Sequence, residues 1–311
     1  MYGKDSDPRG AQNNVVTFEH IDQKELKKRF KKEGRRVKSL PPMAGVSPFI
    51  MVERNDANNC IRDTVNVDRA MRYVREKQAQ GMVNFSLMHV FIAAYIRTVS
   101  QRPAINRFIR GQRVYTRDHI EVNITIKKEM SLEAPDTCVK AYFTPDATAL
   151  DVYKEMSRVI EEYRNAPGGD FDDTAKIVNY IPRLFKKHVI WWLKLLDYFG
   201  GLPRFLTMLS PFHGSFFITS MGSLGIPPIV HHLYNFGNVP IFLAFGALYR
   251  RNVLAEDGSV AQHSYVDFTI NMDERICDGY YYASAFKMIK SLFRNPWALD
   301  VPPETVVKDI E

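Results

Sequence analysis

The sequence has few cysteines and no long apolar run. Its cysteines, Cys60, Cys138 and Cys277, lie far apart and have the spacing of neither a zinc site nor a disulfide framework. We therefore expect no metal, and a reducing cytoplasmic location. Residues 1–14 are polar and lack the apolar core of a secretory signal. No segment reaches the roughly 18 apolar residues that a membrane-spanning helix needs.

The net positive charge of the chain is confined to one segment. The chain of 311 residues has a formal net charge of +7, and residues 24–38, KELKKRFKKEGRRVK, hold nine basic and two acidic residues. This segment alone accounts for the whole excess, so the near-neutral remainder argues against a general nucleic-acid binder. The basic run predicts either a solvated helix face or a surface that attracts an anionic ligand or a membrane.

Hydrophobic periodicity predicts helices and strands that mix along the chain. The predicted helices are 23–32, 67–80, 86–102, 149–165 and 280–294, and the predicted strands are 48–54, 113–115, 121–127, 137–143, 215–219, 240–249 and 262–272. Residues 1–15 are predicted to be a disordered tail. No linker divides residues 16–311, so we predict a single α/β domain with a large mixed β-sheet covered by helices.

The most apolar stretch is 181–212, which contains VIWWLKLLDYFGGLPRFLTMLSPF. The glycines and proline at 200–203 predict two short helices with a break between them. Such a segment covers the sheet or a contact with an adjacent subunit, or it lines a pocket for a lipophilic acceptor or dips into a membrane surface. Trp191 and Trp192, which lie among lysines, make the membrane surface worth testing.

One junction carries a recognisable motif. The run DERICDG, from Asp273 to Gly279, stands between a predicted strand and an aromatic helix. It resembles the HxxxDG motif of chloramphenicol acetyltransferase and of the dihydrolipoyl acyltransferase cores of 2-oxo acid dehydrogenase complexes. In those cores the run is DHRxxDG, which is matched here by Asp273, Arg275, Asp278 and Gly279. The histidine position is occupied by Glu274.

Further matches to this superfamily follow in order along the chain. RPAIN, residues 102–106, is similar to the segment after the second core helix. FFITS, residues 216–220, is similar to the strand that carries the family's hydroxyl residue, which places Thr219 at that position. GSLG, residues 222–225, is similar to the glycine-containing turn that follows. The resemblance covers most of the chain, but the apolar segment 181–212 departs from it as a helical insertion.

The resemblance implies a two-layer α/β sandwich that forms a homotrimer, with a channel at each subunit interface. Coenzyme A or acyl-CoA enters this channel from one side and a small-molecule acyl acceptor from the other. In the family the motif histidine deprotonates the attacking hydroxyl or thiol, and the hydroxyl residue, Thr219 here, donates to the oxyanion. The motif aspartate, Asp278 here, is structural and pairs with an arginine, for which Arg29 and Arg36 are candidates.

Glu274 changes the chemistry that this motif supports. Attack on a thioester needs a base with a pKa near 7, for which histidine is the usual choice. A glutamate has an unperturbed pKa of about 4.3 and becomes a stronger base only when it is buried. His213, His231 and His232 are possible alternative bases, and Cys277 is expected to be a packed thiol.

Two functions remain open on the sequence alone. The first is a CoA-dependent acyltransferase in which Glu274 and Thr219 are catalytic, acting on a hydroxyl, amine or thiol acceptor. The second is a catalytically inactive trimeric homologue that binds a ligand or serves as a scaffold. A place in the core of a dehydrogenase complex is not expected, because the sequence contains no lipoyl domain with its lysine-bearing hairpin.

Overall fold

The computed structural model describes residues 32–127, 136–165, 179–254 and 256–311. The predicted tail, 1–15, and all but Lys32 of the predicted basic helix lie outside these residues. The strands are β1 Arg35–Arg36, β2 Asn58–Asn66, β3 Arg107–Arg110, β4 Arg113–Thr116, β5 Ile120–Lys127, β6 Asp136–Phe143, β7 Phe216–Ser220, β8 Ile241–Leu254 and β9 Val260–Asp273. The helices are α2 Pro42–Ile50, α3 Asp68–Ala79, α4 Leu87–Gln101, α5 Ala149–Asn165, α7 Arg183–Phe199, α8 Arg204–Leu209 and α9 Gly279–Arg294, with 3-10 turns at Pro103–Asn106, Gly222–Leu224 and Pro296–Asp300.

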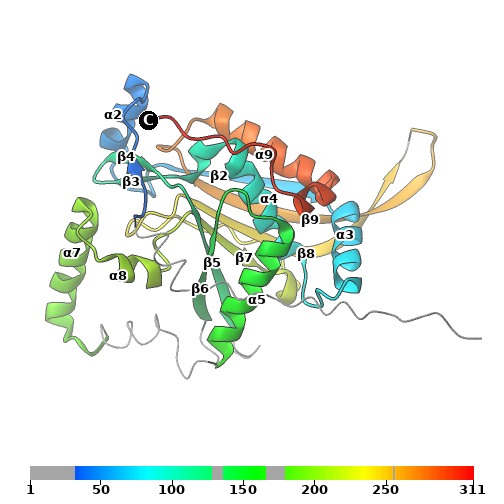
Figure 1. The fold of residues 1–311 in the computed structure, drawn as a ribbon, viewed down its shortest axis with the longest axis horizontal. Coiled ribbons are helices and arrows are strands. Elements are labelled where there is room, and N and C mark those ends of the chain that lie inside the picture. The colour runs from blue at the N-terminus through cyan, green and yellow to red at the C-terminus, as the bar shows by residue number, and fades with distance from the viewer. Residues whose placement is uncertain (1–31, 128–135, 166–178, 255) are drawn as a thin grey trace, which may run out of the picture.

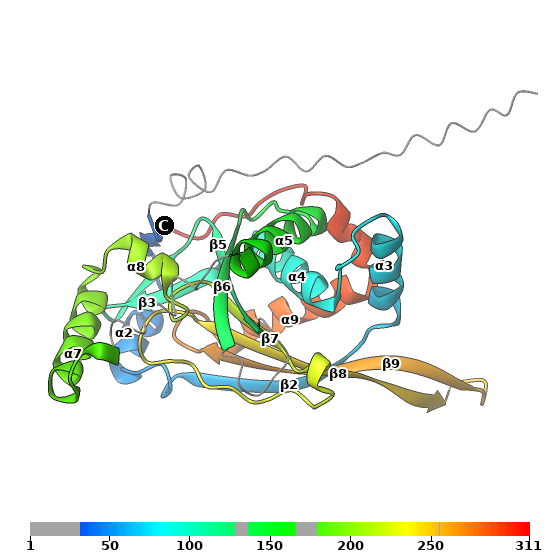
Figure 2. The same cartoon turned by 90° about the horizontal axis from the view of Figure 1, so that it is seen from below.

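The main sheet has six strands in the order β2-β9-β8-β7-β5-β6. Strand β7 runs parallel to both of its neighbours, β5 and β8, and the other pairs are antiparallel. Helices α3, α4, α5 and α9 lie together on one side of this sheet (Figures 1 and 2). The arrangement confirms the predicted two-layer α/β sandwich with a large mixed sheet covered by helices. Strands β1, β4 and β3 form a separate three-stranded sheet.

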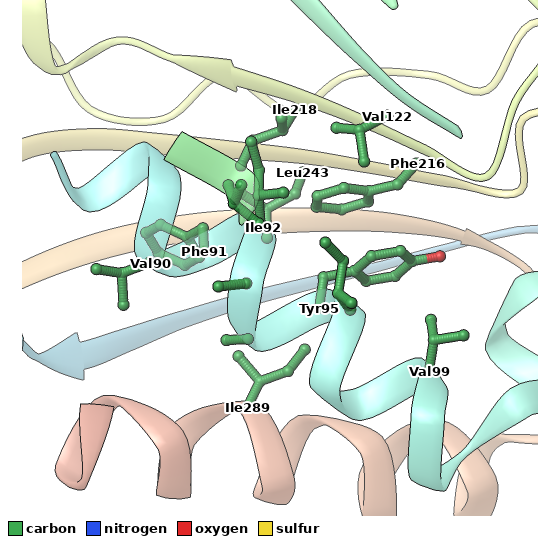
Figure 3. Close-up of a cluster of buried hydrophobic side chains, with 14 of the residues drawn as sticks. Val90, Phe91, Ile92, Tyr95, Val99, Val122, Phe216, Ile218, Leu243 and Ile289 are labelled. Carbon is green, nitrogen blue, oxygen red and sulfur yellow. The ribbon is translucent and has the colours of Figure 1, made fainter. Parts of the chain in front are cut away.

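Helix α4 forms the centre of the hydrophobic core. Twelve of its 15 residues are buried, because the sheet packs on one side of it and α9 on another. Its Tyr95 ring stacks on Phe216 of β7 with ring centroids 4.1 Å apart, and Ile92 points toward the same strands (Figure 3). On the far side of α4, Ile289 of α9 completes this cluster (Figure 3). The core therefore fixes the positions of β7 and α9, which carry the two motifs.

The opposite face of the sheet carries a second, smaller apolar cluster. It consists of Phe217, Leu233, Val239 and Phe242. Two of these residues belong to the segment between β7 and β8, which crosses this face of the sheet. The hydroxyl of Thr269 on β9 donates a 2.6 Å hydrogen bond to the Ile229 carbonyl of that segment and helps to hold it in place.

The prediction of a strand at 48–54 is wrong. Helix α2 begins at Pro42 and ends at Ile50, with Pro48 inside it. A proline at the first helical position needs no N–H partner and has a φ suited to a helix, so Pro42 can begin this helix. The neighbouring strand β2 was missed because its sequence, NNCIRDTVN, is largely polar, which suits its place at the edge of the sheet.

The apolar segment forms one long and one short helix, rather than the two short helices predicted. Helix α7 has 17 residues and α8 has six, and Gly200 ends α7 in the left-handed conformation with φ of 71°. A residue with a Cβ is strained there, so glycine suits this cap. Among the described helices, none is long and apolar enough to cross a membrane.

Candidate functional site

Asp273, at the end of β9, organises the DERICDG junction. Its carboxylate is buried and accepts two hydrogen bonds from Arg275, from Nε at 2.8 Å and from Nη2 at 2.7 Å. The remaining nitrogen of that guanidinium donates to the carbonyls of Met51 and Val52 at 3.0 Å. A bidentate arginine–carboxylate pair is rigid as well as strong. The pair therefore ties the junction to the chain that leaves α2.

A second arginine extends this network to the segment between β7 and β8. Nε of Arg54 lies 3.4 Å from the Asp273 carboxylate, and its other nitrogens donate to the carbonyls of Tyr234 and Gly237 at 2.6 and 2.7 Å. Burial lowers the pKa of Arg54, and the charge of Asp273 opposes that shift. One buried carboxylate thus joins three segments that are distant in the sequence.

Asp278 makes no contact with an arginine in the described part of the chain. Its carboxylate accepts a 2.8 Å hydrogen bond from the Tyr281 backbone N–H and caps α9, which begins at Gly279. Among the described residues no arginine forms an ion pair with Asp278, and Arg29 lies outside them. A carboxylate at a helix N-terminus is already stabilised by the free N–H groups and the dipole. Among the described residues, Asp273 is the aspartate of the motif that pairs with arginines, and the pairing of Asp278 with Arg29 stays a prediction.

Glu274 lies at the surface beside the start of β2. Its carboxylate accepts a 3.2 Å hydrogen bond from the Asn59 side chain, and its backbone N–H donates to the Ala57 carbonyl at 2.9 Å. The side chain is exposed. Within the described part of a single chain, Glu274 therefore lacks the burial that would make it a stronger base.

Thr219 lies far from Glu274. It is 6% exposed on β7 and pairs with Ala244 of β8, which pairs in turn with Thr269 of β9. Glu274 comes five residues after Thr269. At about 3.3 Å per residue and about 4.8 Å between strands, the two side chains are on the order of 15–20 Å apart. One chain does not bring the two predicted catalytic residues together.

The side chain of Thr219 lies on the face of the sheet that the helices leave uncovered. Phe216 and Ile218 belong to the main core under α4, and strand side chains alternate, so Phe217 and Thr219 face the other way. Phe217 stacks on Phe242 there, with ring centroids 4.3 Å apart.

His231 shares that face with Thr219. Its ring stacks on Phe242 with centroids 4.0 Å apart, and Phe242 lies two residues before the strand partner of Thr219. The His231 ring is therefore roughly 8–10 Å from Thr219. Its Nε2 is buried and has no hydrogen-bond partner among the described residues. Burial lowers the pKa of His231, and His232 lowers it further, so the ring is neutral at pH 7 and can accept a proton.

The other two predicted alternative bases have different settings. His213 is fully buried, with Nδ1 2.9 Å from the Ser210 hydroxyl and Nε2 3.1 Å from the Asp197 carboxylate. Both of its ring nitrogens are occupied by structural contacts. His232 is exposed, with its ring edge against Tyr234. Of the three, within the described part of the chain, His231 is the one with a buried ring nitrogen that has no hydrogen-bond partner.

A buried charged cluster was missed by the sequence reasoning. Glu121 of β5 contacts Nε2 of His119 at 2.8 Å, Arg204, and Nζ of Lys140 at 3.5 Å. Burial acts to raise the pKa of Glu121, but Lys140, His119 and Arg204 outweigh it and hold the pKa well below its usual value. Burial lowers the pKa of Lys140 to about 8. Charged residues at alternate positions of two apolar strands were the signal that could have found this cluster.

The described end of the basic segment lines a cavity of about 1360 Å³. Arg35, Arg36 and Lys38 lie in its wall, as do the acidic side chains Asp309 and Glu311 from the end of the chain. The wall therefore carries both signs of charge and does not form a purely cationic site. No group of three or more His, Cys, Asp or Glu side chains in the described ranges is arranged to hold a metal ion. Cys277 is partly buried against the core, and burial raises the pKa of its thiol to about 12, so it is a packed thiol.

Comparison with known proteins gives a partial sequence match. Residues 210–301 match the sequence model of the family described as 2-oxoacid dehydrogenases acyltransferase (catalytic domain). That range contains Thr219, His231 and the DERICDG junction. No curated protein matches the sequence.

Solved structures match over most of the chain. A probable dihydrolipoamide acetyltransferase from Listeria monocytogenes is 15% identical, covers 90% of this chain and 96% of its own, and gives a TM-score of 0.54. Dihydrolipoamide acetyltransferase from Azotobacter vinelandii is 11% identical, covers 84% and 93%, and gives 0.53. The cubic core of a pyruvate dehydrogenase multienzyme complex is 12% identical, covers 85% and 93%, and gives 0.51. These findings confirm the resemblance seen in the sequence: the chain has the fold of the dihydrolipoamide acyltransferase catalytic domains, and residues 210–301 match the sequence of that family.

Proposed function

We propose that this protein transfers an acyl group from a thioester, such as acyl-CoA, to a hydroxyl, amine or thiol acceptor. The observation that carries the proposal is the match of residues 210–301 to an acyltransferase catalytic family, because that range holds both Thr219 and the motif junction. The A. vinelandii relative was solved to examine the role of a serine, a histidine and an asparagine in catalysis, the last two being four positions apart. Glu274 and Asp278 have that same spacing.

The proposed site lies at the contact between two neighbouring copies of the chain in a homotrimer. A separation on the order of 15–20 Å within one chain excludes direct cooperation of Thr219 and Glu274, so a second copy must supply one of them. Apolar side chains are exposed beside both positions. Near the junction they are Met43, Phe49, Ile50 and Val52, and after β7 they are Leu224, Ile226, Ile229, Val230 and Tyr234. Exposed apolar groups of this extent support self-association.

The proposed reaction has three steps. A base takes the proton of the acceptor, and the freed oxygen, nitrogen or sulfur forms a bond to the thioester carbonyl carbon. Thr219 then donates a hydrogen bond to the oxyanion of the tetrahedral intermediate. The intermediate collapses, the carbon–sulfur bond breaks, and the leaving thiolate takes up the proton that the base removed from the acceptor.

Glu274 is the proposed base because it occupies the motif position. Burial at a contact between copies would remove water from its carboxylate and strengthen it as a base. His231 is the second candidate, because its free Nε2 lies on the Thr219 face of the same chain. That the acceptor is lipophilic stays a prediction, and the panel of acyl-CoAs and acceptors described below determines the acyl chain length and the acceptor.

Release of free thiol from a panel of acyl-CoAs, with and without small alcohols, amines and thiols, tests the proposal. We expect Thr219→Ala to lower the rate by about 100-fold or more, the usual cost of losing an oxyanion donor. Loss of activity in Glu274→Gln with retention in His231→Gln assigns the base to Glu274, and the reverse assigns it to His231. Glu256→Gln, on the exposed turn between β8 and β9, is the control. Wild-type rates in both Thr219→Ala and Glu274→Gln would exclude this mechanism.

A catalytically inactive trimeric homologue that binds a ligand or serves as a scaffold is the second candidate function. The observation that favours it is the exposure of Glu274, whose carboxylate accepts a 3.2 Å hydrogen bond from Asn59 at the surface. This function predicts no thiol release by the wild-type chain, calorimetrically detectable binding of coenzyme A or a hydrophobic ligand, and a gain of turnover in Glu274→His. Turnover by the wild-type protein would exclude it.

A further inference from the structure

Helix α7 exposes its apolar side. None of its 17 residues is buried. Its large apolar side chains include Leu184 and Phe199, which are 74% and 76% exposed, and Trp191 and Trp192, which are 55% and 56% exposed. An exposed apolar surface of this kind marks an interaction site.

The helix is held to the rest of the protein at its C-terminal end. The Asp197 carboxylate contacts Nε2 of His213 at 3.1 Å and accepts a 3.2 Å hydrogen bond from the Gly237 backbone N–H. The Tyr198 hydroxyl donates to the Gln112 side chain at 2.7 Å. Both views show α7 standing at one end of the molecule, clear of the main sheet (Figures 1 and 2).

These contacts fix which side of α7 points outward. Successive helical residues are separated by about 100° around the axis. Asp197, which binds the protein body, is therefore on nearly the opposite side from Trp192 and Phe199. The aromatic side of α7 thus faces away from the protein body. An amphipathic helix that covers a core would instead turn this side inward.

The charges on α7 are almost all positive. The helix carries Arg183, Lys186, Lys187 and Lys194, and its one acidic residue, Asp197, is turned toward His213. Arg183, Lys187 and Lys194 recur at helical spacing and form a row along one border of the aromatic side. An exposed apolar surface bordered by cations is complementary to a partner that has an anionic outer layer over an apolar interior.

We propose that α7 docks on the surface of an anionic lipid bilayer, lying parallel to it. Trp191, Trp192 and Phe199 enter the boundary between headgroups and acyl chains, where indole rings are enriched. The cationic row contacts the anionic headgroups. An antiparallel two-fold contact between the α7 helices of two copies fits less well, because that symmetry brings the two cationic rows together. The proposal does not depend on acyl transfer.

Co-sedimentation of the full-length protein with vesicles tests this. We expect binding to vesicles of phosphatidylcholine with phosphatidylserine, and much weaker binding to phosphatidylcholine alone. The variants Trp191→Ser/Trp192→Ser and Lys187→Glu/Lys194→Glu should each lower the partition coefficient at least about tenfold. Matched controls lie on the exposed β8–β9 hairpin: Leu254→Ser/Val260→Ser for the apolar change and Arg250→Glu/Arg251→Glu for the charge change. Thermal melts of all four variants establish that they fold.

Tryptophan fluorescence gives a second readout. The sequence has three tryptophans, and the third, Trp297, is partly buried and donates to Glu76 at 2.7 Å. Brominated lipid should quench the emission of Trp191 and Trp192 and leave the emission of a Trp191→Phe/Trp192→Phe variant unchanged. Failure of the wild-type chain to bind anionic vesicles overturns the proposal. So does a change of oligomeric mass in Trp191→Ser/Trp192→Ser without lipid binding, which would assign α7 to a contact between copies.

Discussion

Helices α4 and α7 have similar lengths and similar apolar content but opposite surroundings. Twelve of the 15 residues of α4 are buried, whereas none of the 17 residues of α7 is. Helix α4 packs between the main sheet and α9, and α7 is attached mainly through Asp197 and Tyr198 near its end. The difference shows that apolar residues at helical spacing indicate a helix without indicating what covers it.

The largest expected effect is on the free energy of unfolding, when a phenylalanine of α4 and one of α7 are each replaced by alanine. Phe91 of α4 packs on Phe245 and Phe293 with centroids 4.8 and 4.6 Å away, so Phe91→Ala should lower the free energy of unfolding by about 3–5 kcal/mol. Phe185 of α7 is exposed, so Phe185→Ala should change it by less than about 0.5 kcal/mol. Denaturant unfolding measures both. Equal losses would mean that a contact between copies buries α7.

The two aspartates of the junction should differ in a similar way. Asp273→Ala leaves the buried Arg275 and Arg54 without their carboxylate and should cost about 3–5 kcal/mol of unfolding free energy. Asp278→Ala removes only a helix cap, at about 1 kcal/mol. Chemical denaturation of the two variants gives the comparison. A larger cost at Asp278 would contradict the assignment of the arginine pairing to Asp273.

Acid should destabilise the protein through His89 of α4. Burial lowers the pKa of His89 to about 4, whereas an unfolded histidine titrates near 6.5. The unfolded chain therefore takes up this proton first, so stability is full above about pH 6.5 and falls by about 3 kcal/mol as the pH drops toward 4.

The variant His89→Gln should remove that part of the pH dependence. Glutamine at this position can still accept the hydrogen bond from the Ser86 backbone N–H in the capping box. A His89→Gln protein with the wild-type slope would show that other groups cause the acid sensitivity.

The smallest expected effect concerns the attachment of α7. Tyr198→Phe removes the hydroxyl that donates to Gln112 and should cost about 0.5–1 kcal/mol of unfolding free energy. Hydrogen exchange of the α7 amides should speed up, whereas exchange in α4 should not. An unchanged exchange rate in α7 would mean that the Asp197 contacts, without the Tyr198 hydrogen bond, hold the helix in place.

Periodicity and turn residues predicted most of the fold. Helix α5 has the predicted bounds, and the predicted helices 67–80 and 86–102 and the strands of the sheet centre lie within a few residues of the observed ones. Those segments are decided locally, by apolar spacing and by breaks at Gly81 and Pro103. The edge strand β2 and helix α2 were not predicted, because partners distant in the sequence and a proline at a helix start decide them.

The candidate site was predictable in part. The family resemblance proposed Thr219 and Glu274 as catalytic residues, and the sequence offered His231 as one of three alternative bases. Only the strand register shows that Thr219 and Glu274 are far apart in one chain, and only the stacking on Phe242 places His231 on the Thr219 face. The role of Asp273 depends on Arg54, which approaches from a segment more than two hundred residues earlier. The cytoplasmic location stays a prediction.

Mixing two inactive variants tests the central claim, a site shared between copies, most directly. Thr219→Ala and Glu274→Gln chains, co-expressed with different tags and purified for both, should each be inactive alone. The mixed trimers should regain about a third of the wild-type thiol release, because in each of them one of the three interfaces joins an intact Thr219 from one copy with an intact Glu274 from its neighbour. No release by the mixed assembly, beside an active wild-type protein, would contradict the shared site.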